Sequence, residues 1–168
     1  MEKLSVRDYA HIALIAAAYV VLTVTPPLNA ISYGMYQFRV SEMLNFLAFY
    51  HPKYIIAVTL GCMLANLYSF ELIDVAVGGG STLIFVTLGV LLFSRYKKDY
   101  LFGGLFNKAF FYFSFFFAAS MVTIAAELAL LGAPFWLTWV TTAVGELMSL
   151  LVGAVIMDKI GQRFDLSQ

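Results

Sequence analysis

The sequence predicts an all-α membrane protein, a bundle of six transmembrane helices. Of the 168 residues, 62% are hydrophobic and only 12% are charged, whereas soluble domains carry about 25% charged residues. Mean hydropathy is +0.87. Apolar runs recur along the whole chain, and a helix needs about 20 such residues to cross a bilayer. We therefore expect residues 1–168 to form a single integral membrane domain.

Prolines and glycines divide the chain into six apolar segments. The first ends at Thr25-Pro26-Pro27, and His51-Pro52 separates a short second segment, polar on one side, from the third. The fourth contains three consecutive glycines, and Gly132-Ala133-Pro134 separates the fifth from the sixth. Proline does not continue a helix, and glycine is typical of helix C-termini. The predicted spans are Tyr9–Val24, Gln37–Tyr50, Lys53–Tyr68, Leu72–Phe93, Phe106–Leu131 and Phe135–Ile156.

The basic residues of the connecting segments orient this bundle. Lys and Arg occur before the first span, between the second and third, between the fourth and fifth, and after the sixth. The other three connections contain neither residue. By the positive-inside rule, this alternation predicts six crossings with both termini cytoplasmic. The alternative, five crossings with the second segment partly inserted, would put Lys53 and the Arg95–Lys98 cluster on opposite sides.

Charged side chains lie inside or at the edge of the apolar segments. A charge at mid-bilayer costs roughly 2.5–3.5 kcal/mol, so such residues usually face a polar cavity or one another. In the predicted topology most of them lie in the outer half, where Asn66 of the third span joins them, and Glu146 lies deeper. Carboxylates in such excess predict a pocket for a ligand that is rich in N–H donors or positively charged. The charged residues are Arg39, Glu42, Glu71, Asp74, Glu127 and Glu146.

Simpler interpretations exist for some of these residues. Arg39 and Glu42 are three apart on one helical face, so an intrahelical ion pair is the alternative for them. Glu71 lies near a loop, so for this residue alone an interfacial position is favoured over the pocket. Glu127 and Glu146 favour the pocket, because the sequence around them holds no basic residue to neutralise them.

Small residues gather in two of the predicted spans. The Gly78-Gly79-Gly80 run costs about 1 kcal/mol per glycine relative to alanine in a helix. It indicates a helix break or the close approach of a ligand or another backbone. A phosphate-binding loop is not indicated, since no P-loop lysine follows. Ala13 and Ala17 are four apart, which suits a closely packed helix from the same bundle or from a partner protein.

Several kinds of chemistry are missing from the sequence. The formal net charge is zero, which argues against nucleic acid as a partner. His11 and His51 are isolated, and no H-E-x-x-H, G-x-S-x-G or Cys/His pattern occurs. Cys62 is the single cysteine, so the chain has no internal disulfide. We predict that the protein is not an enzyme and holds no metal or cofactor.

Three sequence blocks, together with the alanine-rich first span, resemble one family of membrane proteins. The blocks are QFRVSE at Gln37–Glu42, LGCMLANL at Leu60–Leu67 and DVAVGGGSTL at Asp74–Leu83. They resemble the QueT family among the substrate-binding (S) components of energy-coupling factor (ECF) transporters. The resemblance covers nearly the whole chain. It departs from the family in the first span, where Leu14 interrupts one register of small residues.

The resemblance implies a substrate-capture subunit of the prokaryotic cell membrane. Such a subunit takes up a queuosine precursor, a 7-deazaguanine base, in an outer-half pocket. It works with a membrane coupling protein (T component) and two ATPase subunits, docked partly through Ala13 and Ala17. One carboxylate would accept two N–H groups of the base, and a second would pair with a 7-aminomethyl cation. The implied binding residues are Arg39, Glu42, Asn66, Glu71, Asp74, Glu127, Trp139 and Glu146.

Three points stay open at this stage. Tyr33, Tyr36 and Trp139 are all candidates for stacking on the base. An ECF S component for a cationic vitamin such as thiamine is an alternative function. A stand-alone cation channel or proton-coupled carrier, with the acids as ion ligands, is another.

Overall fold

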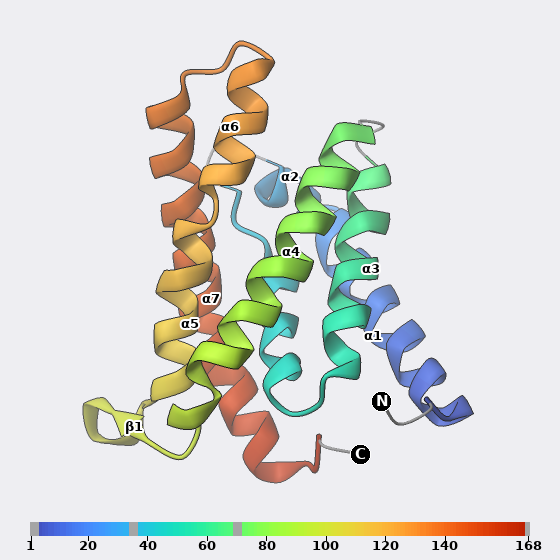
Figure 1. The fold of residues 1–168 in the computed structure, drawn as a ribbon, viewed down its shortest axis with the longest axis vertical. Helices are drawn as coiled ribbons and strands as arrows, with labels where there is room; N and C mark the ends of the chain where they lie inside the picture. The colour runs from blue at the N-terminus through green and yellow to red at the C-terminus, as the bar shows by residue number, and fades with distance from the viewer. Residues whose placement is uncertain (1–3, 34–36, 69–71, 167–168) are drawn as a thin grey trace.

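The computed structural model describes residues 4–33, 37–68 and 72–166. These residues form a helical bundle with one short β-hairpin (Figure 1). The helices are α1 (Val6–Val24), α2 (Leu28–Ser32), the 3-10 helix η1 (Val40–Phe49), α3 (Lys53–Leu67), α4 (Leu72–Phe93), η2 (Ser94–Tyr96), η3 (Phe102–Gly104), α5 (Lys108–Ala119), α6 (Val122–Leu130) and α7 (Phe135–Arg163). Strands β1 (Tyr100–Leu101) and β2 (Phe106–Asn107) pair antiparallel around η3.

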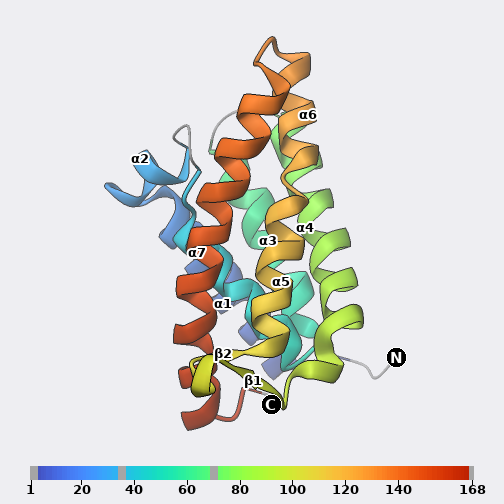
Figure 2. The same cartoon turned by 90° about the vertical axis from the view of Figure 1, so that its left-hand side faces the viewer.

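Two groups of helices enclose η1. Helices α1 and α4 pack on α3, and α5 and α6 pack on α7. Between these groups, η1 contacts α1, α3, α4 and α7 (Figures 1 and 2). Its Phe46 and Phe49 stack against Phe110 and Phe113 of α5, with ring centroids 4.5–5.5 Å apart. The aromatic core is therefore built around the shortest predicted span.

Four helical segments within the described residues are long and apolar enough to cross a membrane. They are Val6–Val24, Leu72–Tyr96, Lys108–Leu130 and Phe135–Arg163. Val40–Phe49 and Lys53–Leu67 are apolar but shorter. The prediction of an all-helical membrane bundle is confirmed at this level, and the fourth predicted span coincides with α4.

The second predicted span, Gln37–Tyr50, differs from an α-helix of that length. Its helical part begins only at Val40 and is wound as a 3-10 helix, which has three residues per turn. Glu42 and Asn45 are three residues apart and so stand in one row along this winding, whereas Arg39, just before it, has an extended backbone. Runs of 3-10 helix beyond three or four residues are uncommon, and here nearly every residue from Ser41 to Phe49 is buried against neighbouring helices.

The fifth predicted span is broken into α5 and α6 at Ser120 and Met121. The Ser120 hydroxyl donates to the Phe117 carbonyl (2.6 Å), and the Thr123 hydroxyl donates to the Ser120 carbonyl (2.9 Å). Hydroxyl side chains that bond to nearby carbonyls in this way compete with regular helix bonding and bend helices. The break directs α6 toward α4, where Thr123 and Ser81 hydroxyls lie 2.8 Å apart.

Local signals explain several helix ends. Ser5 caps α1 in a reciprocal capping box with Asp8, and Asn107 accepts from the Ala109 amide at the start of α5. Gly132 adopts a φ of 98° in the turn after α6, a conformation that favours glycine.

One end of the bundle carries the hairpin. Helices α1, α3 and α5 begin at this end, and helices α4 and α7 end there (Figure 1).

Candidate functional site

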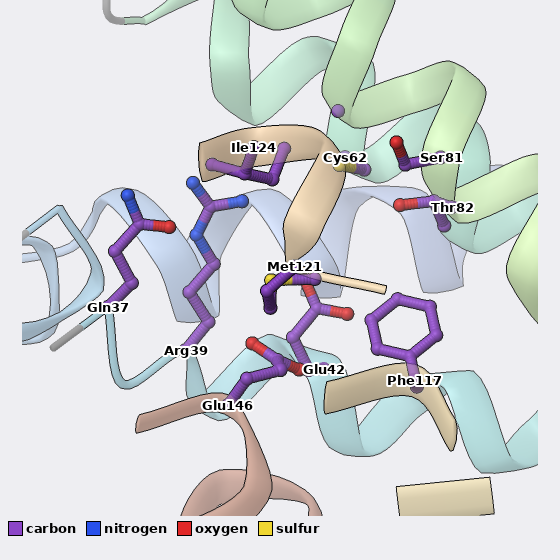
Figure 3. A pocket seen from close by; sticks show the side chains of 11 residues that line it. Gln37, Arg39, Glu42, Cys62, Ser81, Thr82, Phe117, Met121, Ile124 and Glu146 are labelled. Carbon is purple, nitrogen blue, oxygen red and sulfur yellow. The ribbon is translucent and has the colours of Figure 1, made fainter. Parts of the chain in front are cut away.

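A buried cavity lies between η1 and helices α3 to α7, which surround it. Its volume is about 20 Å³, close to what one water molecule needs. The close-up in Figure 3 shows Glu42 and Glu146 together on one wall, with Arg39 and Gln37 beside them and Ser81 and Thr82 opposite. The lining residues are Gln37, Arg39, Glu42, Cys62, Gly78, Ser81, Thr82, Phe117, Met121, Ile124 and Glu146.

Two further cavities adjoin the first. One, of about 60 Å³, shares Gln37, Arg39 and Ile124 with it. The other, of about 360 Å³, is lined by Thr138, Thr141 and Thr142 of α7 among other residues, and it also includes Gln37. Gln37 therefore borders all three spaces, and it has a φ of 42°. This left-handed conformation is uncommon for a residue other than glycine.

Glu42 is held by two donors from inside the protein. It is 3% exposed, and its carboxylate accepts from the Tyr19 hydroxyl of α1. Its other oxygen accepts from the Asn45 side-chain amide at 2.5 Å. Since Asn45 follows Glu42 by one 3-10 turn, the winding of η1 brings the two side chains together.

Arg39 faces the same space without forming an ion pair with Glu42. Its Nε donates to the Ser32 carbonyl (3.3 Å), and its guanidinium lies 5.3 Å from the centroid of the Tyr33 ring. Within the described residues no Arg39–Glu42 contact is short enough for an ion pair. The intrahelical ion pair weighed from the sequence is therefore wrong, and the guanidinium stays directed at the cavities.

Glu146 projects from the middle of α7 and is 2% exposed. Its Oε1 is buried and has no hydrogen-bond partner in the part of the chain that the structure describes. A buried acceptor left in this state costs about 1–3 kcal/mol. Among the cavity residues, Glu146 is thus ready to accept a donor from a ligand.

The second cavity gathers another group of predicted residues. Asn66, Asp74 and Glu127 line it together with Arg39. Asn66 and Glu127 are buried, and the Asn66 amide donates to the Asp74 carbonyl (3.0 Å). The structure therefore brings six of the eight predicted residues to two adjoining cavities, with Arg39 common to both.

The glycine run explains how Asn66 reaches this position. Helix α4 continues through Gly78 without a break, so the close-approach interpretation holds. A Cβ at Gly78 would lie 2.3 Å from Asn66 Nδ2, whereas a Cβ at Gly80 would meet nothing within 4 Å. The missing side chain at Gly78 therefore makes room for Asn66.

Of the two remaining predicted residues, the structure places only Trp139. Trp139 does not line the three cavities; its Nε1 donates to the Ala119 carbonyl (3.2 Å), and its ring lies near Phe135 and Trp136. Glu71 and Tyr36 lie outside the described residues. Ala13 and Ala17 are exposed on α1, on the face away from buried Tyr19.

Other lining residues were not predicted from the sequence. Phe117 and Met121 are apolar residues in an apolar segment, so no sequence signal separates them from core positions. Ser81 and Thr82 belong to the DVAVGGGSTL block, which marked the region but not these side chains. The described residues hold no cluster of three or more metal-binding side chains.

The arrangement is suited to binding, not to bond breaking. It offers carboxylate acceptors and one guanidinium in a buried space, with an aromatic ring and a thioether on the wall. Residues 9–162 match the model of the QueT transporter family. The chain belongs to this family. It is also 60% identical over 169 residues to the "Queuosine precursor transporter QueT" of Lactococcus lactis subsp. cremoris (strain MG1363), and the match covers 100% of both chains.

Membership in the QueT family decides two of the sequence-based predictions. The family and the Lactococcus relative are transporters, not enzymes, so the prediction that the chain is not an enzyme is confirmed. The apolar helices and the transporter family together make it a multi-pass protein of the cell membrane. No solved structure matches the chain.

Proposed function

We propose that this chain is the substrate-binding (S) subunit of an ECF-type importer and that it captures a queuosine precursor, a 7-deazaguanine base. The main observation behind this proposal is that Glu42, Glu146 and Arg39 line the same buried cavity. The name of the Lactococcus relative supports the substrate, and the chemistry of the base supports the match. Its N1–H and exocyclic amine form a donor edge that a single carboxylate accepts in a bidentate way.

In this proposal six of the eight residues predicted from the sequence contribute to the pocket. Arg39 and Glu42 shape and orient the pocket, and Glu146 and Glu127 accept N–H groups of the base. Asn66 and Asp74 complete the hydrogen bonding from the second cavity. Glu71 and Trp139 stay predictions from the sequence alone, and this proposal gives neither of them a contact with the base.

The empty spaces must join to admit the ligand. A cavity of about 20 Å³ is far smaller than a bicyclic base. Gln37, which borders all three spaces, is the residue whose displacement would merge them. The third space, with its row of threonines on α7, would then connect the acids with the upper end of the bundle.

We further propose a single membrane domain with six crossings and both termini cytoplasmic. The short helices η1 and α3 would supply the second and third crossings. Transport would require a membrane coupling protein and two ATPases, and the exposed Ala13 and Ala17 of α1 would form part of the docking face.

Calorimetric titration of the purified protein with 7-aminomethyl- and 7-cyano-7-deazaguanine tests the proposal. We expect binding, weakened about tenfold or more by Glu146→Gln, because a charge-assisted hydrogen bond is lost. Asp158→Asn is the matched control. This buried acid lies near the C-terminal end of α7, away from the cavities, and accepts a hydrogen bond from the Gln162 side-chain amide (2.8 Å). No binding of either base at millimolar concentration would refute the substrate assignment. Displacement by thiamine, or ion flux through liposomes that hold this chain alone, would favour the alternative functions.

A further inference from the structure

Tyr19 of α1 reaches the cavity through residues that line it. It is fully buried, and it is not among the residues that line the three cavities. Its hydroxyl donates to Oε1 of Glu42, while Asn45 donates to Oε2. Both oxygens of the Glu42 carboxylate are therefore engaged by the protein before any ligand arrives.

The two carboxylates on the cavity wall are thus not equivalent. Glu42 and Glu146 line the same space (Figure 3). Glu42 has a donor on each oxygen, whereas Oε1 of Glu146 has no partner among the described residues. A ligand N–H donor gains more from an unsatisfied acceptor than from one that must first release a partner.

The backbone around Tyr19 keeps its hydroxyl in place. A Cβ at Gly61 of α3 would lie 2.6 Å from Tyr19 Cβ, so the glycine allows α1 to lie directly against α3. One turn further along α1, the Thr23 hydroxyl donates to the Ser41 hydroxyl of η1 (2.7 Å). Helix α1 therefore reaches η1 through two buried hydroxyls, and only that of Tyr19 bonds to a cavity residue.

We propose that Tyr19 is a positioning residue of the ligand site. Together with Asn45 it fixes the Glu42 carboxylate on the cavity wall, so that Glu146, and not Glu42, accepts N–H donors of the ligand in this cavity. Without the Tyr19 hydroxyl, the Glu42 side chain is released toward the Arg39 guanidinium and into the space that the base must occupy. This inference rests on the function proposed above and adds a residue of α1 to its site.

A double-mutant cycle tests the role of Tyr19, with 7-aminomethyl-7-deazaguanine as the titrated ligand. We expect Tyr19→Phe to weaken binding about tenfold or more, the effect of losing one hydrogen bond to a charged group. In a Glu42→Gln background the same substitution should change affinity by less than about twofold. The reason is that Tyr19 acts through the Glu42 carboxylate, so its effect disappears once that carboxylate is removed. Thr23→Val is the matched control, since it removes one fully buried hydroxyl from the same helix; we expect it to stay within about threefold of wild type.

The outcomes separate this inference from the proposed function. If the wild type binds and Tyr19→Phe binds within about threefold of it, the positioning role is refuted and the proposed function stands. A full loss that persists in the Glu42→Gln background also refutes it, because the effect would then be structural. If the wild type binds no 7-deazaguanine, both fail. Should Tyr19→Phe not be recovered folded, the same cycle with Asn45→Leu applies, since Asn45 holds the other oxygen.

Discussion

The Lys53 ammonium lies 2.8 Å from the Asp8 carboxylate and joins the first turn of α3 to the first turn of α1. The Lys53 side chain is fully shielded from solvent, while that of Asp8 keeps 22% of its exposure. His11 Nδ1 lies 3.1 Å from the same ammonium. The pair is therefore asymmetric: its positive member is buried, and its negative member can reach water.

This asymmetry predicts unequal effects for the two single substitutions. Asp8→Asn takes the carboxylate from a buried ammonium and also weakens the cap of α1, so we expect it to cause the larger loss in stability. Lys53→Met leaves a partly solvated carboxylate and should cause the smaller loss. Thermal unfolding in detergent measures both. Equal losses would contradict the asymmetry, and the double variant should be more stable than Asp8→Asn alone.

The glycine run offers a second prediction with its own control. Gly78→Ala would push the Asn66 amide from its place and break its bond to the Asp74 carbonyl, so we expect weaker ligand binding. Gly80→Ala meets nothing within 4 Å and should raise stability by up to about 1 kcal/mol through helix propensity, with affinity unchanged. Calorimetry and thermal unfolding of the two variants check this. Equal affinities in both would show that Asn66 plays no part in binding.

Aromatic contact with the base can be assigned by comparing two rings. Phe117 borders the cavity, whereas Trp139 bonds to the Ala119 carbonyl away from it. We expect Phe117→Leu to weaken binding about fivefold to tenfold through loss of stacking. Trp139→Phe should change it by less than about twofold. The reverse order would assign the stacking role to Trp139, one of the three aromatic candidates from the sequence.

Lys97 gives a prediction for alkaline pH. Its ammonium donates to the Phe49 carbonyl (2.9 Å) and lies 3.7 Å from the centroid of the Tyr50 ring. Partial burial lowers the pKa of Lys97 below its ordinary value of 10.5. Between the lowered pKa of the folded state and the ordinary pKa of the unfolded chain, the unfolded chain binds more protons than the folded one. In that pH range Lys97 therefore makes stability rise with pH. At lower pH both states are protonated and its contribution is constant.

The pH dependence of Lys97 is measured as a difference between variants. Unfolding midpoints are compared from neutral pH to about pH 10.5 for the wild type, Lys97→Gln and the exposed-site control Lys98→Gln. The rise should be present in the wild type and in Lys98→Gln and reduced in Lys97→Gln. An identical pH profile for all three proteins would contradict it.

The sequence predicted those parts of the fold that hydropathy and helix breakers determine. Leu72–Phe93 was predicted to the residue, because a long apolar run between polar ends leaves one solution. The break between α5 and α6 was missed, since it depends on hydroxyls at Ser120 and Thr123 that look ordinary in an apolar segment. The hairpin near Tyr100 was missed for a similar reason, as strands of two residues leave no periodic pattern.

The site was predictable where charge is costly and unpredictable where it is not. Glu42, Glu127 and Glu146 stood out because hydrocarbon rejects carboxylates, and all three line the cavities. Tyr19 and Phe117 gave no such signal, because apolar helices commonly contain aromatic residues. Their roles follow from which helices become neighbours, and that is a property of the packed chain.

The winding of η1 has a consequence for how the backbone exchanges hydrogen with solvent. The i to i+3 hydrogen bonds of a 3-10 helix are poorer in geometry than the i to i+4 bonds of α-helices such as α3 and α4. We therefore expect the packing of Phe46 and Phe49 to stabilise η1 more than its own backbone hydrogen bonds do. Deuterium should therefore enter the amides of η1 before those of α3, although both segments are buried. Of these two segments, the one that carries Glu42 would open first, and a ligand that seals the cavity would slow exchange in η1 more than in α3.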